Sequence, residues 1–215
     1  MEDIRAVIFD LDGTLIDTEK IYSVVWPRAV ADMGYEMSHE QYLSLRSLGR
    51  PFAPARLREW FGEDFDYDRA REIRKGYFEE YLREHGISRK RGVDKLLRFL
   101  RERGIVTAIA TATDIKRAER YLEMASLSGC FSRVISAVQV PEGKPSPYVY
   151  EYACRELGLR PSQCLAVEDA PNGIRSAYAA GLRVIMVPDQ SGPEEEFAHM
   201  LTACVDSLED ICDIL

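Results

Sequence analysis

The stretch AVIFDLDGTLIDTE, residues 6 to 19, decides the fold of this 215-residue sequence. It joins four apolar residues, Ala6 to Phe9, directly to the carboxylates of Asp10 and Asp12. A short continuous apolar run is typical of a strand covered on both faces of a parallel sheet. If the strand continues through Asp12, the two side chains lie about 7 Å apart and repel each other by about 2 kcal/mol. A buried acidic pair of this kind indicates a bound cation rather than a solvated turn.

Further apolar runs, with helical patterns between most of them, follow along the chain. The runs are Ile105–Ala110, Val134–Val138, Leu165–Val167 and Val184–Val187. Residues 93–100 and 148–157 have the apolar spacing of amphipathic helices, and each is followed by a glycine, Gly104 or Gly158, suited to a left-handed helix end. This alternation predicts an α/β fold with a doubly wound parallel sheet.

About ninety residues without a clear strand separate the first apolar run from the second. Their central part, residues 18–88, is rich in Arg, Glu, Tyr and Leu and reads as helical. We therefore predict an α/β core made of residues 1–17 and 89–215, and a helical cap made of residues 18–88. We expect a mobile cap over the sheet edge; the alternative is a rigid extension of the core.

Composition and charge exclude several classes of protein. The net charge of −8 argues against a nucleic-acid-binding protein, and no run reaches the roughly 18 apolar residues of a membrane span. The N-terminus lacks the features of a secretory signal, and the five cysteines form no CxxC pair. We expect a cytoplasmic monomer with reduced thiols that binds neither nucleic acid nor a membrane.

Polar residues follow the apolar runs where a parallel sheet gathers its ligands. Besides Asp10 and Asp12, these residues are Thr111, Lys144, Glu168 and Asp169. Oxygen ligands favour Mg²⁺ over zinc, and an ammonium and a hydroxyl suit phosphate oxygens. An EF-hand loop starting at Asp10 would need Gly at position 6 and Glu at position 12, but Leu15 and Ile21 stand there.

Four stretches of the sequence resemble the four motifs of the haloacid dehalogenase-like hydrolases. They are DLDGTLIDTE, ATAT, GKPSP and VEDAPNGIRSAYAAG, in the family's order. The most similar branch has a helical cap after the first strand and includes phosphatases and β-phosphoglucomutases. The resemblance implies a Rossmann-like core with an inserted helical cap, Mg²⁺ as cofactor and a small phosphorylated metabolite as substrate.

The resemblance also implies roles for individual residues. Asp10 resembles the nucleophile that forms an aspartyl phosphate, and Asp12 the general acid and base. The phosphate would be held by Gly13, Thr111, the amide of Ala112, and Lys144. The metal shell would comprise Asp10, the carbonyl of Asp12, Glu168 and Asp169. Asn172 would orient this shell or the phosphate.

The choice of reaction depends on a few positions. Asp12, which the dehalogenases of the family lack, favours phosphate esters. Arg50 in LGRP resembles the mutase branch, but Tyr22 stands where that branch has a histidine. We therefore expect a phosphatase of small sugar or nucleoside-type phosphates, with a phosphosugar mutase as the alternative.

A catalytically silent phospho-ligand-binding protein is a third possibility, which the presence of Asp10, Asp12, Lys144 and Asp169 disfavours. The candidates for substrate contact in the cap are Tyr22, Trp26, Arg46, Arg50 and Lys75. Each could instead pack between cap helices or face solvent.

Overall fold

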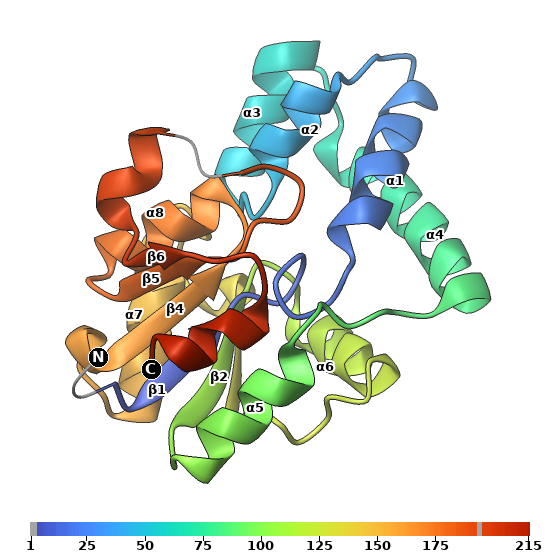
Figure 1. Cartoon of the computed structure of the whole chain (residues 1–215). Coiled ribbons are helices and arrows are strands. Elements are labelled where there is room, and N and C mark those ends of the chain that lie inside the picture. Colours follow the sequence, from blue (N-terminus) through green and yellow to red (C-terminus); the bar gives the residue numbers. More distant parts are fainter. Residues whose placement is uncertain (1–3, 193–194) are drawn as a thin grey trace.

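The computed structural model describes residues 4–192 and 195–215, and a six-stranded parallel sheet forms its centre (Figure 1). The strands are β1 Ala6–Phe9, β2 Val106–Thr111, β3 Arg133–Ser136, β4 Cys164–Glu168, β5 Arg183–Met186 and β6 Ala203–Cys204. Their order across the sheet is β3-β2-β1-β4-β5-β6. The opening strand thus lies between β2 and β4, where the strand order reverses and open α/β sheets bind their ligands.

The strands agree with the predicted apolar runs, with two differences. The third run was predicted to reach Val138, but β3 ends at Ser136 and residues Ala137–Gln139 form a 3₁₀ turn, η1. The side chain of Ser136 accepts a hydrogen bond from the amide of Val138, which favours this turn over a longer strand. The two-residue strand β6 was not predicted, because two residues carry no periodic signal.

Helices cover both faces of the sheet, which confirms the doubly wound α/β fold. Val7 and Phe9 of β1 pack on one face with α5 (Val93–Glu102) and α6 (Ile115–Met124). Ala6 and Ile8 pack on the other face with α7 (Tyr148–Leu157) and α8 (Pro171–Ala179). Short 3₁₀ helices complete the core: η2 Pro161–Gln163, η3 Glu195–Met200 and η4 Leu208–Asp213. Within the described residues, no helix has the length and apolarity needed to cross a membrane.

Four helices interrupt the core between β1 and α5 and lie together outside the layers of the sheet (Figure 1). They are α1 Glu19–Ala31, α2 His39–Leu45, α3 Phe52–Phe61 and α4 Tyr67–His85. The two segments that connect them to the core run side by side: the amide of Asp17 donates to Ser88 O at 2.9 Å, and that of Lys90 to Leu15 O at 2.9 Å. The insertion is helical, as predicted; its independence and motion as a cap remain a prediction.

Candidate active site

The carboxyl ends of β1, β2 and β4 place the predicted residues side by side. Asp10 directly follows β1 and its amide donates to Val167 O of β4 at 2.9 Å. Thr111 is the last residue of β2 and Glu168 the last of β4. The sheet register, with Phe9 opposite both Ile109 and Val167, therefore brings three separate motifs to one edge.

Lys144 joins two of these carboxylates. Its Nζ donates to Asp10 Oδ1 at 2.5 Å and to Glu168 Oε1 at 2.6 Å, and its side chain is fully buried. The hydroxyl of Tyr150 donates to the same Glu168 oxygen at 2.5 Å. Burial alone would lower the pKa of Lys144, but the charges of Asp10 and Glu168 outweigh it and raise that pKa. Lys144 is thus a fixed positive charge at the base of the site.

Asp10, Glu168 and Asp169 form a buried acidic cluster whose oxygens lie within 4.8 Å of one another. Burial, together with the neighbouring carboxylates, raises the pKa of Asp10 and that of Asp169, while Lys144 and Arg46 respectively oppose the rise. Asp10 Oδ2 and Glu168 Oε2 are buried and accept no hydrogen bond from any residue that the structure describes. Crowded carboxylate oxygens with unused lone pairs are a donor set that fits Mg²⁺.

Asp12 has a different environment from Asp10. The hydroxyl of Thr18 donates to its Oδ1 at 2.7 Å, and the hydroxyl of Thr113 to its Oδ2 at 2.8 Å. The side chain of Asp12 is not part of the acidic cluster; the predicted metal contact was its carbonyl. Sequence reasoning missed Thr18 and Thr113, although Thr113 lies within the quoted ATAT motif and follows Thr111 by two residues.

Gly13 lies against the acidic cluster. Its φ is +86°, and a Cβ at this position would come within 2.5 Å of Asp169 Oδ2 and 2.8 Å of Glu19 Cγ. Only glycine fits both this left-handed backbone conformation and this close approach. Gly13 does not line the neighbouring cavity, so its position indicates a steric role, and the predicted phosphate contact stays a prediction.

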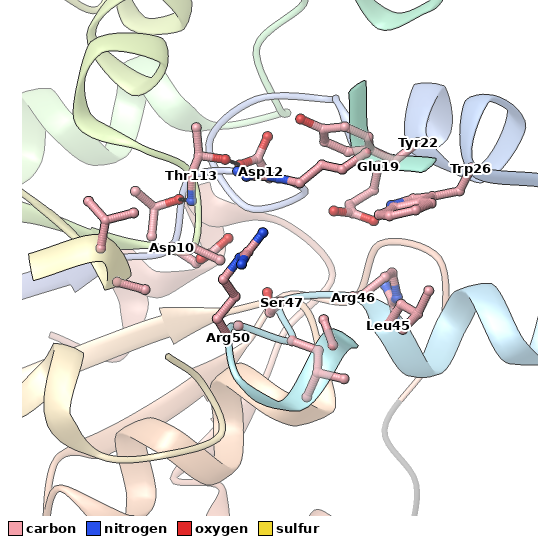
Figure 2. Close-up of a pocket in the computed structure, with 18 of the residues that line it drawn as sticks. Asp10, Asp12, Glu19, Tyr22, Trp26, Leu45, Arg46, Ser47, Arg50 and Thr113 are labelled. Carbon is pink, nitrogen blue, oxygen red and sulfur yellow. Dashed lines mark hydrogen bonds between the residues drawn. The ribbon is translucent and has the colours of Figure 1, made fainter. Parts of the chain in front are cut away.

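A cavity of about 410 Å³ opens beside Asp10, between the strand ends and the inserted helices. Figure 2 shows Asp10 and Asp12 on the core side and Tyr22 and Trp26 projecting from α1. The predicted residues that line the cavity are Asp10, Asp12, Thr111, Ala112, Tyr22, Trp26, Arg46 and Arg50. Lys144, Glu168 and Asp169 are buried next to Asp10 and do not line the cavity.

Lys75 lies outside the cavity, contrary to its selection as a substrate contact. Its side chain is 49% exposed and pairs with Glu72 at 3.6 Å. The preceding residue, Arg74, lines the cavity instead. Neighbouring helical residues point about 100° apart, so an error of one position moves a side chain from the interior to the surface.

Arg46 and Asn172 connect the inserted helices to the core. Arg46 Nη1 lies 3.3 Å from Asp169 Oδ2, and Arg46 Nη2 donates to the hydroxyl of Ser191. The side-chain amide nitrogen of Asn172, Nδ2, donates to Ser44 O at 3.1 Å and to Arg46 O at 2.8 Å. The side-chain nitrogen of Asn172 therefore holds the end of α2 in place, and the predicted role of Asn172 in orienting the metal shell or the phosphate stays a prediction.

Glu19 is a fourth buried carboxylate beside the cavity, and no role was predicted for it. The hydroxyl of Tyr42 donates to Glu19 Oε2 at 2.5 Å and to Glu19 O at 2.8 Å. Burial raises the pKa of Glu19 to about 7, and the charge of Asp12 adds to this rise, although the bond from Tyr42 opposes it. The sequence places Glu19 in the opening motif but does not show that the side chain turns inward.

Comparisons with known proteins agree with this geometry. The family model described as haloacid dehalogenase-like hydrolase matches residues 4–181. Protein CbbY of Rhodobacter capsulatus is 31% identical over 205 residues, which cover 91% of this chain and 90% of that protein. Hexitol phosphatase B of Escherichia coli K12 is 31% identical over 196 residues, covering 86% and 84% respectively.

A solved structure resembles the whole chain as well. CbbY from Rhodobacter sphaeroides in complex with phosphate matches with a TM-score of 0.79 at 27% identity, covering 97% of this chain and 96% of that one. The family match extends over all four sequence motifs and the structural match over nearly all of the chain. This chain is therefore an enzyme of the haloacid dehalogenase-like hydrolase family.

Proposed function

We propose that this enzyme is a Mg²⁺-dependent phosphatase that hydrolyses small phosphorylated metabolites, such as sugar or nucleoside-type phosphates. The observation that carries the proposal is the buried Lys144, which bridges Asp10 and Glu168 beside Asp169 at the edge of an open cavity. Phosphatases among the curated relatives, including hexitol phosphatase B, support the same reaction class.

Asp10 is the proposed nucleophile. Lys144 holds Asp10 Oδ1; Asp10 lines the cavity, and its Oδ2, which accepts no hydrogen bond from the described residues, would attack phosphorus. A bond forms between this oxygen and phosphorus as the bond to the ester oxygen breaks, giving an aspartyl phosphate. Thr111, the amide of Ala112, and Lys144 would stabilise the charge that spreads over the phosphoryl oxygens.

Asp10, Glu168 and Asp169, with the carbonyl of Asp12, would hold Mg²⁺. When bound, the ion offsets the negative charge of the carboxylates and of the phosphate. Burial first, and the neighbouring carboxylates after it, raise the pKa of Asp10 and that of Asp169, so a bound cation would favour the ionised form of both groups.

Asp12 is the proposed general acid and base. It would give a proton to the leaving oxygen and later take one from the water that hydrolyses the aspartyl phosphate. Bonds from Thr18 and Thr113 fix both of its oxygens, so the carboxyl group is oriented before substrate arrives. Such preorganisation reduces the rearrangement needed for proton transfer.

The remaining proposals concern the whole chain. Residues 18–88 would act as a cap on a core of residues 1–17 and 89–215, with Tyr22, Trp26 and Arg50 contacting substrate. A monomeric cytoplasmic enzyme without nucleic-acid or membrane partners stays the expectation from sequence. A phosphatase releases free phosphate from a sugar phosphate, whereas a mutase would return an isomer of it.

The proposal is tested by assaying a panel of phosphorylated metabolites for released phosphate, with Mg²⁺ and with EDTA. We expect metal-dependent release that falls by about 10³-fold or more in Asp10→Asn. Asp17→Asn is a matched control, because Asp17 lies in the same motif but pairs with Lys20 and Lys90 outside the cavity. Turnover that persists in Asp10→Asn, or that is equal in EDTA, would contradict the proposal.

A further inference from the structure

Arg74 is a buried cation without an acidic partner in the described part of the chain. It comes from α4, lines the cavity, and is only 9% exposed. Among the residues that the structure describes, no ion pair or hydrogen bond engages its guanidinium group, and its Nε is buried without a hydrogen-bond partner. A buried charge is costly unless it is paired, so this arrangement indicates that a ligand supplies the missing partner.

Aromatic rings hold Arg74 in position. Its guanidinium carbon lies 5.0 Å from the ring centroid of Tyr22 and 4.8 Å from that of Trp26. Tyr22 in turn stacks on Phe78, with 4.4 Å between ring centroids. Rings interact with the face of a guanidinium group, so these contacts fix its plane but supply no acceptor for the N–H donors that lie in that plane.

Among the described residues, four other arginines line the cavity, and each differs from Arg74 in burial or in pairing: Arg46, Arg50, Arg71 and Arg117. Arg46 is paired with Asp169 at 3.3 Å and Arg117 with Asp114 at 2.6 Å. Arg50 pairs with Asp68, but both side chains are more than half exposed, so this pair is weak and does not isolate Arg50 from a ligand. Arg71 forms no ion pair either but is only half-buried, so Arg74 alone among these five arginines combines deep burial with the lack of an acidic partner in the described structure.

We propose that Arg74 binds a second anionic group of the substrate, a phosphate or a carboxylate, distinct from the phosphate that is transferred to Asp10. This inference rests on the proposed phosphatase function. A hydroxyl group offers an acceptor but no charge, whereas an anion satisfies both the donors and the charge of a buried guanidinium group. The preferred substrate is then a sugar bisphosphate or a phosphorylated acid rather than a phosphate ester of a neutral polyol.

The charges of the cavity fit such a substrate. Lys144, beside Asp10 at the strand ends, would attract the reacting phosphate, and Arg74, on α4, would bind the second anion. One substrate would then contact both the core and the inserted helices. Binding energy from the second anion would hold the reacting phosphate in place for transfer.

The test compares kcat/KM for matched pairs of substrates that differ in one anionic group. The pairs are fructose 1,6-bisphosphate with fructose 6-phosphate, glucose 1,6-bisphosphate with glucose 6-phosphate, and 3-phosphoglycerate with glycerol 3-phosphate. We expect the wild-type enzyme to prefer the doubly anionic member of at least one pair by about 10- to 100-fold. The sugar pairs report a second phosphate and the last pair reports a carboxylate.

Arg74→Gln should remove this preference, and Arg74→Lys should restore part of it, because Lys keeps the charge but lacks the planar group. Lys75→Gln is the matched control, since Lys75 is the next residue on α4 and is exposed. It should keep the wild-type preference. Equal losses on both members of every pair in Arg74→Gln would show that Arg74 is only structural and overturn the proposal.

Equilibrium binding separates this proposal from the proposed reaction. In the Asp10→Asn background, Arg74→Gln should weaken binding of the preferred doubly anionic compound by about 10- to 100-fold and binding of its singly anionic partner much less. Wild-type turnover without any preference for a second anion would overturn the inference and leave the phosphatase standing. The absence of metal-dependent phosphate release from every ester would instead contradict the proposed function.

Discussion

Asp12 and Glu19 show how two carboxylates of one short motif acquire different properties. Asp12 accepts hydrogen bonds from two threonine hydroxyls and lines the cavity. Glu19 lines the same cavity but is buried and accepts a hydrogen bond from Tyr42, and burial raises its pKa to about 7. The sequence identifies both residues as acidic, but their environments are set by Thr113 and Tyr42, which belong to other elements.

The raised pKa of Glu19 predicts that the free energy of unfolding depends on pH. The unfolded chain loses the proton of Glu19 near its ordinary pKa of 4.5, whereas the folded chain keeps it up to about pH 7. The folded state therefore binds more protons between these values, so this contribution to stability is full below pH 4.5 and falls as pH rises to about 7. The loss amounts to roughly 3 kcal/mol.

Urea unfolding of wild type and Glu19→Gln in EDTA measures this contribution. Relative to the variant, the free energy of unfolding of the wild type should fall between pH 5 and pH 8. Asp10 is present in both proteins and largely cancels in the difference, whereas the charge of Glu19 also helps to raise the pKa of Asp169, so the difference includes this coupling. A difference that does not change with pH would show that Glu19 titrates normally in the folded protein.

At the scale of elements, the segment after α2 is joined to the loop that carries Lys144. The amide of Gly49 donates to Lys144 O at 2.8 Å, and the amide of Gly143 donates to Arg50 O at 2.7 Å. A Cβ on Gly49 would lie 2.6 Å from Gly143 Cα, so the two backbones touch where side chains would not fit. This contact connects the position of the inserted helices to that of the buried lysine.

Gly49→Ala should therefore separate the two loops and lower kcat/KM by about 10-fold or more, because small misplacements of reacting groups are costly. Gly76→Ala is the control: Gly76 lies in α4 with nothing within 4 Å of an added Cβ. It should keep full activity and gain up to about 1 kcal/mol of stability from helix propensity. Steady-state kinetics and urea unfolding of both variants test this prediction. An unchanged kcat/KM in Gly49→Ala would show that catalysis does not need the close approach of Gly49 to Gly143.

The predictability of the elements follows from the strength of their local signals. The strands near Phe9 and Val167, and the helices α5 and α7 that come before Gly104 and Gly158, were predictable, because their apolar patterns and the glycines after them are local features; both glycines have positive φ. It was harder to predict which residues of α4 face the interior. Ala70, Arg74, Phe78 and Leu82, four residues apart, form its buried face. This spacing was the signal that could have identified Arg74 instead of Lys75.

At the scale of the molecule, the four motifs and their order were sufficient to predict the fold and the acidic edge of the sheet. The partners that connect the inserted helices to the core could not be predicted. Asn172 bonds to residues more than 120 positions earlier, and Arg46 reaches Asp169 across a similar separation. Such pairings depend on how the inserted helices pack against the core, and the residues that meet there are far apart in the sequence.

Metal binding should stabilise the whole molecule. A ligand at about 100 times its dissociation constant adds about 2.7 kcal/mol, which corresponds to roughly 5–10 °C in the midpoint of thermal unfolding for a chain of this size. Mg²⁺ should therefore raise the midpoint of thermal unfolding of the wild type by roughly this amount. Asp169→Asn, which removes one carboxylate of the acidic cluster, should respond far less. An equal rise in both proteins would place the stabilising ion elsewhere.

The central claim is that Asp10 accepts a phosphoryl group in this cavity, and mass spectrometry of the acid-quenched enzyme tests it most directly. The Asp12→Asn variant is mixed with 4-nitrophenyl phosphate and Mg²⁺, because this good leaving group needs little protonation while the loss of Asp12 slows hydrolysis of the intermediate. We predict a burst of nitrophenol and one phosphoryl group per chain on the peptide that contains Asp10. A burst without a phosphorylated chain, or a phosphoryl group on another residue, would contradict the account.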